Sequence, residues 1–334
     1  MLEKSVEGKS FILIIPNDFK IYEIFNDNLE KFGFDLISIV PKKFRYKSKK
    51  QRIYNFFHKT LTQNKSFKKA LVKQFHSDCI EAKIKHLKDK SVDYILVIRP
   101  DTVDIETLQR LIKIGKKVVA YQWDGLDRFP QVLQYIDLFE SFLIFDEADY
   151  DKYKSKFSNL HKSENFYFDY DDAPNQPDSN TVYYIGAYYE NRMEELNKIL
   201  DEIEKYPVEL DINLRNPSSK CPTTKKYIKF FRNYVDFKTN LAWMKKAKIL
   251  LDFKVEEHNG LSLRFFEALR YQKKIITNNK TVMEYDFYDP QNVFIINHDD
   301  MSRLGEFIST PYKEISKEIV DQYSFSSWLS KYVL

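Results

Sequence analysis

The sequence of 334 residues has few cysteines and lacks long apolar runs, and each shortage excludes a class of protein. Its two cysteines, Cys79 and Cys221, are too few for a disulfide framework or a four-cysteine zinc site, which indicates unpaired thiols in a reducing compartment. The first apolar run extends only from Phe11 to Pro16, and no later run approaches the length that crosses a bilayer. We therefore expect neither secretion nor membrane insertion, and we predict a cytoplasmic protein.

Glycine is also scarce, with only seven in the whole chain. Each glycine is therefore expected where the backbone needs a positive φ, or where a ligand or another backbone comes close. Gly125, Gly186 and Gly260 all follow apolar segments.

Acidic residues are absent from residues 42–76, which contain ten Lys and two Arg. The formal net charge of the chain is +4. Subtracting the twelve positive charges of this segment from +4 leaves a net charge of −8 on the residues outside 42–76. Aromatic residues such as Phe44, Tyr46, Phe56 and Phe57 alternate with the cations in this basic segment. The segment is typical of an anionic membrane surface, a nucleic-acid site or a solvated helical face. We favour the membrane surface, because no RNA-stacking motif accompanies the charges and the rest of the chain is acidic.

Short apolar runs alternate with helical periodicity along the chain, which predicts parallel strands joined by crossover helices. The run at 92–100 is apolar throughout, as expected of a strand buried on both faces. The expected strands are 10–16, 35–41, 92–100, 117–124, 141–146, 181–187, 208–214, 248–255, 273–279 and 292–297. We predict an α/β protein with two Rossmann-like domains that face a cleft.

Residues 169–180 combine acidic residues, two prolines and asparagines without apolar periodicity, which is typical of a connection between domains. We therefore place an N-terminal domain at 1–170, with a basic helical insertion at 42–90. A second domain follows at 171–310, and 311–334 is expected to be helical. Asp169 and Asp171 form an Asp-x-Asp pattern, but no apolar strand precedes it, so we expect no metal there.

The segment 250–279 carries the strongest candidate for a ligand site. Arg264 and Glu267 are three residues apart on a predicted helix that begins after Gly260, where helix N-terminal N–H groups favour bound phosphate. An arginine there can neutralise a diphosphate, and a carboxylate can accept hydrogen bonds from a ribose diol. A surface Arg–Glu pair on an amphipathic helix has the same spacing.

The motif Gly-Leu-Ser-Leu-Arg-Phe-Phe-Glu-Ala-Leu at 260–269 resembles the donor-site region of bacterial glycosyltransferases of the GT-B fold. The sequence is similar in particular to lipopolysaccharide and capsule glycosyltransferases that carry a Trp-Asp motif followed by Phe-Asp-x-x-Asp. Those motifs read YQWD at 121–124 and FDEAD at 145–149 here, and YIGAYYENR follows from 183. The resemblance extends from about Val92 onward.

This resemblance implies that Glu267 binds the donor ribose, that Arg264 and Lys254 meet the diphosphate, and that Gly186 and Gly260 line the same pocket. Many retaining GT-B enzymes have two glutamates seven residues apart in this region. The earlier acids here, Glu256 and Glu257, do not have that spacing before Glu267. The resemblance therefore does not support a retaining mechanism. His258 and Asn259 lie in the same loop and are given little weight.

In the N-terminal half, Asp124 follows a predicted buried strand at the sheet edge where α/β proteins bind ligands. It is the best-placed general base for an inverting transfer, although a helix-capping role fits the same position. Arg99 and Asp146 end two other strands and are weaker candidates for acceptor contacts.

We predict a glycosyltransferase that needs neither metal nor cofactor and acts on a nucleotide-sugar donor and a glycan or lipid-linked glycan acceptor. The histidines have no metal-ligand spacing, and no P-loop or Gly-x-Gly-x-x-Gly motif occurs. The acceptor is expected to be a lipopolysaccharide or capsule precursor at the inner face of the cytoplasmic membrane, and nucleic acid is not an expected partner. The alternatives are a nucleotide-sugar epimerase or hydrolase on the same fold, or a basic adaptor without enzymatic activity.

Overall fold

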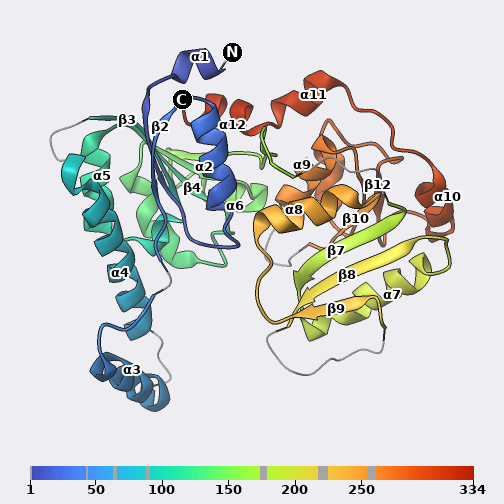
Figure 1. The fold of residues 1–334 in the computed structure, drawn as a ribbon, viewed down its shortest axis with the longest axis horizontal. Coiled ribbons are helices and arrows are strands. Elements are labelled where there is room, and N and C mark those ends of the chain that lie inside the picture. The colour runs from blue at the N-terminus through green and yellow to red at the C-terminus, as the bar shows by residue number, and fades with distance from the viewer. Residues whose placement is uncertain are drawn as a thin grey trace. The chain divides into compact units, whose positions relative to one another are not determined.

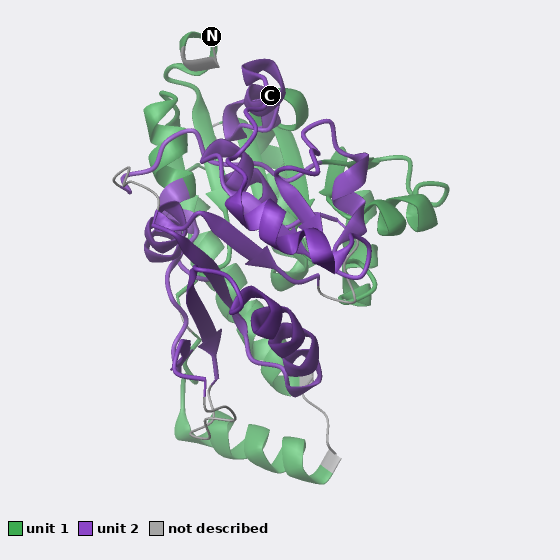
Figure 2. Cartoon of the chain, turned by 90° about the vertical axis from the view of Figure 1, so that its right-hand side faces the viewer, with its two compact units in different colours: residues 1–18, 25–163, 329–334 green, residues 19–24, 164–328 purple. Residues whose placement is uncertain are grey.

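The computed structural model contains two parallel six-stranded sheets. Figure 1 shows the strands and helices along the chain. The structure describes residues 2–42, 44–62, 66–87, 91–173, 179–216, 225–254 and 260–334. Figure 2 distinguishes two units, of which unit 1 comprises Met1–Asp18, Phe25–Ser163 and Leu329–Leu334. Unit 2 comprises Phe19–Ile24 and Glu164–Trp328. Within the described residues, no helix has the length and apolarity required to span a bilayer.

The sheet of unit 1 has the strand order β2-β1-β3-β4-β5-β6, with every neighbouring pair parallel. Its strands are β1 (Ser10–Ile14), β2 (Asp35–Ile39), β3 (Val92–Ile98), β4 (Gly115–Gln122), β5 (Ser141–Ile144) and β6 (Leu160–Lys162). The α-helices in this part of the chain are α1 (Leu2–Val6), α2 (Tyr22–Lys31), α3 (Lys49–Thr62), α4 (Ser66–Ile84), α5 (Ile105–Ile114) and α6 (Glu147–Tyr153). Short 3-10 turns are η1 (Lys85–Leu87), η2 (Pro100–Thr102) and η3 (Pro130–Leu138).

The sheet of unit 2 has the order β12-β11-β10-β7-β8-β9 and is also parallel. Its strands are β7 (Thr181–Ala187), β8 (Glu209–Arg215), β9 (Ile228–Phe231), β10 (Ile249–Asp252), β11 (Lys274–Thr277) and β12 (Val293–Ile295). The α-helices are α7 (Met193–Ile203), α8 (Phe237–Lys246), α9 (Leu263–Arg270), α10 (Leu304–Ser309), α11 (Lys317–Gln322) and α12 (Phe325–Tyr332), and the 3-10 turns are η4 (Glu190–Arg192), η5 (Lys280–Glu284) and η6 (Met301–Arg303).

Apolar periodicity explains how the helices cover these sheets. In α7, the buried residues Leu196, Ile199, Leu200 and Ile203 recur at the spacing of one helical face, and they pack into the core formed by β7, β8 and β10. Burying such a side chain contributes about 1.5–3 kcal/mol. The central strands are apolar on both faces because helices lie on both sides of a parallel sheet.

In each sheet, successive strands are first added in one direction from the first strand and later in the opposite direction. The place where the direction changes is the reversal point of the sheet. In unit 1 the reversal lies between β1 and β3, and in unit 2 it lies between β7 and β10. Crossover connections leave to opposite sides at such a point, which opens a crevice at the carboxyl ends of the two strands.

The predicted α/β class with two Rossmann-like sheets is confirmed. The strands β6 and β9 and the helices α1, α6, α8 and α10 were not expected from the sequence. The C-terminal stretch forms two helices, α11 and α12, and Phe325 and Trp328 of α12 stack on Phe166 at ring distances of 4.8 and 4.9 Å.

The segment expected to connect the domains is bonded into unit 2 at its first residues, and the division between the units falls after Ser163. Asp169 accepts hydrogen bonds from the backbone and hydroxyl of Ser326. Asp171 accepts from Lys245 at 2.8 Å and from the Tyr271 hydroxyl at 2.6 Å. Lys245 is only 5% exposed, so the Asp171 carboxylate is needed to compensate a buried ammonium group. Residues 174–178 of this segment lie outside the described residues.

Candidate active site

The reversal point of unit 2 is a gap between two strands that an arginine side chain fills. Strands β7 and β10 pair only at Val182 with Ile249 and at Tyr183 with Leu250. Beyond these pairs, the guanidinium of Arg264 donates to the carbonyl of Ile185 at 2.9 Å and to the carbonyl of Leu251 at 3.0 Å. One arginine on α9 thus satisfies carbonyls at the ends of both diverging strands.

Asp252, the last residue of β10, completes this anchor. Its carboxylate accepts from the Ser262 hydroxyl at 2.8 Å and from the Arg264 guanidinium at 3.3 Å. Ser262 immediately precedes α9, so these bonds fix the start of the helix to the end of the strand. Arg264 therefore belongs to the structural frame of the site, which the spacing of Arg264 and Glu267 alone did not indicate.

Glu267 lies one helical turn after Arg264 and is 5% exposed. Its Oε1 atom is buried and has no hydrogen-bond partner among the described residues. Burial raises the pKa of this carboxyl to about 7, with Arg264 opposing the rise and Asp252 adding to it. A surface ion pair on an amphipathic helix would have neither property. Glu267 is thus a buried acid that can accept hydrogen bonds from a bound ligand.

Gly186 lies in β7 beside the same gap. A Cβ atom at this position would lie 2.5 Å from the Tyr184 hydroxyl oxygen, closer than any such contact tolerates. The Tyr184 ring in turn lies 5.6 Å from the Arg264 guanidinium carbon. Gly186 is therefore required for the packing of Tyr184 against the arginine that fills the gap.

Gly260 and Lys254 flank residues 255–259, which lie outside the described part of the chain and include Glu256, Glu257, His258 and Asn259. The backbone N–H of Lys254 donates to Asn278 Oδ1 at 2.7 Å, and Asn279 Nδ2 donates to the Gly260 carbonyl at 3.3 Å. Two asparagines after β11 thus hold both ends of this loop near the carboxyl edge of the sheet.

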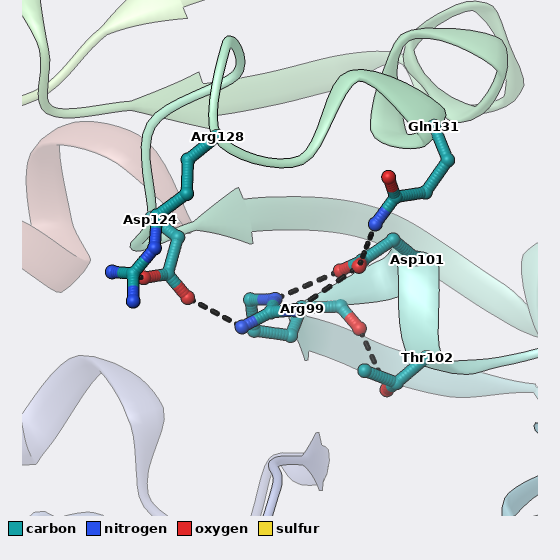
Figure 3. Close-up of polar contacts among 6 residues, drawn as sticks. All are labelled: Arg99, Asp101, Thr102, Asp124, Arg128 and Gln131. Carbon is teal, nitrogen blue, oxygen red and sulfur yellow. Dashed lines mark hydrogen bonds and ion pairs between the residues drawn. The ribbon is translucent and has the colours of Figure 1, made fainter. Parts of the chain in front are cut away.

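In unit 1 the strand-end residues Arg99 and Asp124 are brought together, as Figure 3 shows. The Arg99 guanidinium donates to both carboxylate oxygens of Asp101, at 2.8 and 3.1 Å, and also to Asp124. It lies 4.2 Å from the centre of the Phe129 ring, and its side chain is 13% exposed. Arg99 has a left-handed backbone (φ 58°), which costs a non-glycine residue about 1 kcal/mol or more and is held by these contacts.

Asp124 is paired on both of its carboxylate oxygens. Oδ2 accepts from Arg99, and Oδ1 accepts from Arg128 at 3.3 Å. Asp124 does not cap a helix, because the turn of η3 begins later, at Pro130. The residue thus occupies the carboxyl edge as expected, within an ion-pair network that the sequence did not predict.

Two further titratable residues, Asp18 and His76, belong to this region and were missed from the sequence. Asp18 follows β1, directly across the reversal point from Arg99. Although the residue as a whole is exposed, desolvation of its carboxyl raises its pKa, while Arg99 opposes the rise and Asp124 adds to it. His76 interacts electrostatically with Asp18, and desolvation lowers its pKa. Its Nδ1 atom is buried without a hydrogen-bond partner among the described residues.

Gln122 ends β4 and is completely buried. Neither its amide nitrogen nor its amide oxygen has a hydrogen-bond partner among the described residues. An unpaired buried amide costs roughly 1–3 kcal/mol, so such a group is uncommon away from functional sites. Gln122 is a polar residue near the end of the apolar run 117–124, and this feature of the sequence could have indicated it as a candidate.

The two aspartates of the Phe-Asp-x-x-Asp motif hold α6 and a neighbouring loop in place. Asp146 is buried and caps α6, because its carboxylate accepts from the N–H groups of Ala148 and Asp149 at 3.0 and 3.2 Å. Asp149 accepts from the backbone N–H of Leu126 at 2.5 Å. The motif therefore ties the loop that carries Asp124 to α6, and one oxygen of the Asp146 carboxylate is engaged in the cap.

The basic segment forms α3 and α4, and Figures 1 and 2 show α3 beyond the end of α4, clear of the sheet of unit 1. Large apolar side chains on α3 are more than half exposed: Ile53 55%, Tyr54 57%, Phe56 62%, Phe57 54% and Leu61 79%. Phe44 and Tyr46, which were expected at the same surface, are instead half-buried, and Phe44 packs on Phe75 of α4 at 5.8 Å. Within the described part of the basic segment, the large apolar side chains that are exposed therefore lie on α3.

Comparison with known proteins supports the fold. No protein-family model matches the chain, and no curated protein matches its sequence. The solved structure of sucrose-phosphate synthase from Thermosynechococcus elongatus is similar, with a TM-score of 0.56 at 9% identity over 97% of each chain. A trehalose-6-phosphate synthase structure has a TM-score of 0.52 at 10% identity, covering 96% of this chain and 97% of the other. At these identities the similarity shows that the chain has the GT-B type of fold.

A pH-dependent stability is expected from Asp149, whose pKa burial raises to about 6. The folded state keeps this proton up to about pH 6, whereas the unfolded chain releases it near pH 4, so wild-type stability falls as the pH rises between these values. Asp149→Asn keeps an acceptor for the Leu126 N–H and removes the titration. The free energy of unfolding of the variant relative to wild type, measured by urea denaturation, should increase by about 1–3 kcal/mol from pH 4.5 to pH 7.

The exposed Asp151 on the same helix provides the matched control. Asp151→Asn should leave the pH profile of wild-type stability unchanged. A stability difference between Asp149→Asn and wild type that does not vary with pH would show that the carboxyl is ionised throughout.

Proposed function

We propose that the chain is a glycosyltransferase in which unit 2 binds a nucleotide-sugar donor and unit 1 binds a glycan acceptor. The observation that carries the proposal is Glu267, a buried carboxyl with an unpartnered oxygen beside the reversal point of a Rossmann-like sheet. Open α/β sheets bind their ligands at this position. The GT-B type of fold supports the assignment, and trehalose-6-phosphate synthase, which shares that fold, carries out glycosyltransfer with retention.

The donor chemistry follows from the groups at the gap between β7 and β10. We assign the ribose diol to Glu267, whose carboxylate accepts hydrogen bonds, and the diphosphate to the edge formed by Gly186, Gly260 and Lys254. Arg264 already donates to two strand carbonyls, so it contributes positive charge to the diphosphate while it keeps α9 in place. The positive charge of Arg264 and Lys254 then stabilises the leaving diphosphate.

Two carboxylates of unit 1 compete for the role of general base in an inverting transfer. Asp124 was expected from the sequence, but both of its oxygens are held by arginines. Asp18 has no ion pair among the described residues, lies at the reversal point and has a raised pKa. A raised pKa makes a carboxylate a better proton acceptor. We therefore propose Asp18 as the base, with Asp124 orienting Arg99 toward the acceptor.

We propose further that the acceptor is a lipid-linked precursor of lipopolysaccharide or capsule, and that the chain reaches it from the inner face of the cytoplasmic membrane through α3. Ile53, Phe56, Phe57 and Leu61 recur at helical spacing on one face of α3, and the helix contains no acidic residue. A basic amphipathic helix with exposed aromatic side chains is suited to an anionic lipid surface.

The donor assignment predicts a pH-dependent affinity. A ribose diol binds the ionised form of Glu267, so affinity for the cognate nucleotide sugar should rise by about tenfold from pH 6 to pH 8, given a pKa of about 7. Glu267→Gln should abolish this dependence and weaken binding at pH 8 by roughly 10- to 100-fold, because a charged hydrogen bond contributes about 1.5–3 kcal/mol. Calorimetric titration with a panel of nucleotide sugars measures both effects. The exposed Glu284 is the control, and Glu284→Gln should bind as wild type; an unchanged affinity in folded Glu267→Gln contradicts the assignment.

The assignment of Asp18 as the general base predicts different effects for substitutions of Asp18 and of Asp124. Asp18→Asn should retain stability and donor affinity while the transfer rate falls by roughly 10²- to 10⁴-fold. Asp124→Asn should lower both the rate and the stability, the latter by about 1–2 kcal/mol, because ion pairs with two arginines are lost. Transfer kinetics and thermal unfolding test the two variants side by side. Full activity of Asp18→Asn with loss of activity in Asp124→Asn would assign the base to Asp124, and full activity of both would indicate a mechanism without a base.

The membrane assignment predicts that Phe56→Ser with Phe57→Ser reduces co-sedimentation with phosphatidylglycerol vesicles by tenfold or more. Each buried aromatic side chain contributes about 1.5–3 kcal/mol to insertion. Replacing Lys49 and Lys50 with Gln should also weaken binding, most strongly at low salt, since each cation adds about 1 kcal/mol. Met283→Ser removes an exposed apolar side chain from unit 2 and serves as control. Wild-type protein that ignores these vesicles at low salt would refute the membrane assignment.

A further inference from the structure

A second cavity of unit 1, of about 570 Å³, lies apart from the candidate acceptor site. Its walls come from the first half of β4, from β5, from the last two residues of β6, from α6, and from the end of α12. The basic and aromatic side chains that line it are Lys117, Lys162, Lys331, His161, Tyr150 and Tyr332. This set combines three ammonium groups with hydrogen-bond donors on aromatic rings.

Lys162 lines the cavity at the carboxyl end of the sheet, whereas Lys117 lines it far from that end. Lys117 is the third residue of β4, whereas Gln122 is the last and Asp124 follows the strand. Five residues of extended strand place Lys117 roughly 16 Å from Gln122. A ligand that contacts Lys117 and Lys331 therefore occupies a site distinct from the one built around Arg99 and Asp124.

The charges of the cavity are unbalanced. Glu140 is the single acidic residue in its lining against three lysines. Lys162 is paired with Glu147 at 2.7 Å, but the Lys117 ammonium group, on a half-buried residue, has no ion pair or side-chain hydrogen bond among the described residues. An anion in the cavity would supply the counter-charge that the Lys117 ammonium group lacks among the described residues.

We propose that this cavity binds a small phosphate ester, with the phosphate group held by Lys117 and Lys331 and the organic part lying between Tyr150 and Tyr332. The three lysines of the lining outnumber its single carboxylate, and lysine binds phosphate as a point charge. The volume exceeds that of a phosphate ion, which leaves room for a glycerol or sugar unit. The proposal is independent of the glycosyltransferase assignment, because it uses none of the residues placed at the donor gap or at the Arg99 network.

The test is calorimetric titration of the full chain at low salt with glycerol 1-phosphate, glucose 1-phosphate and inorganic phosphate. Wild-type protein should bind at least one of the two esters saturably and more tightly than inorganic phosphate, and it should ignore neutral glucose. Lys117→Gln and Lys331→Gln should each weaken ester binding by roughly tenfold or more, because a charge-assisted hydrogen bond is lost. Lys113 is exposed on α5, and Lys113→Gln should bind as wild type.

Lipid headgroups also contain phosphate esters, so a second experiment distinguishes a lipid from a free phosphate ester. Phosphatidylglycerol vesicles are titrated into a variant with Phe56→Ser and Phe57→Ser, which removes the apolar face of α3, with and without Lys117→Gln. Vesicle binding that depends on Lys117 would identify the anion as a lipid headgroup, and ester binding alone would identify a free metabolite. Absence of saturable binding in both arms, or equal affinity in folded Lys117→Gln and wild type, would overturn the proposal.

Discussion

The anchoring of Arg264 across the gap between β7 and β10 is the interaction on which the arrangement of unit 2 depends. The ladder between these strands ends after two residue pairs, so the carbonyls of Ile185 and Leu251 need other donors. A guanidinium meets both at once, because its N–H groups diverge in a rigid plane. Since Arg264 belongs to α9, the same bonds fix the helix against the sheet and place Glu267 one turn further along. The position of the candidate ribose carboxyl is thus a consequence of how a strand gap is filled.

In unit 1 an arginine at the reversal point, Arg99, is also held in place, but by two carboxylates and an aromatic ring. Arg99 ends β3 in a left-handed conformation that favours glycine, and the fork to Asp101, the ion pair to Asp124 and the Phe129 ring hold it there. The loop carrying Asp124 is itself held, because Asp149 accepts from Leu126 while Asp146 caps the helix that presents Asp149. Charged groups at this edge are therefore fixed before any ligand arrives, which is the condition under which they act most strongly on a reacting group.

The sequence predicted the elements that depend on long apolar runs, such as β3 and β10, and the α/β class that follows from their alternation. It did not predict β6 and β9, because edge strands of three or four residues leave little periodic signal. The burial of Glu267 was equally hidden, since three-residue spacing from Arg264 is also typical of a surface pair. Asp18 and His76 come from distant segments, and the electrostatic interactions of Asp18 with Arg99 and with His76 depend on the strand order, which local patterns do not specify.

The contrast between Asp252 and Glu267 explains how unit 2 tolerates two buried carboxyls beside one arginine. Asp252 takes the direct contact with Arg264 and a second bond from Ser262, so its charge is compensated. Glu267 has no direct bond to the guanidinium, and desolvation then favours its neutral form and raises its pKa to about 7. A proton thus takes the place that a ligand hydroxyl would occupy. Under the proposed donor assignment, a bound diol would exchange that proton for hydrogen bonds, and the buried site would keep an acceptor without a permanently uncompensated charge.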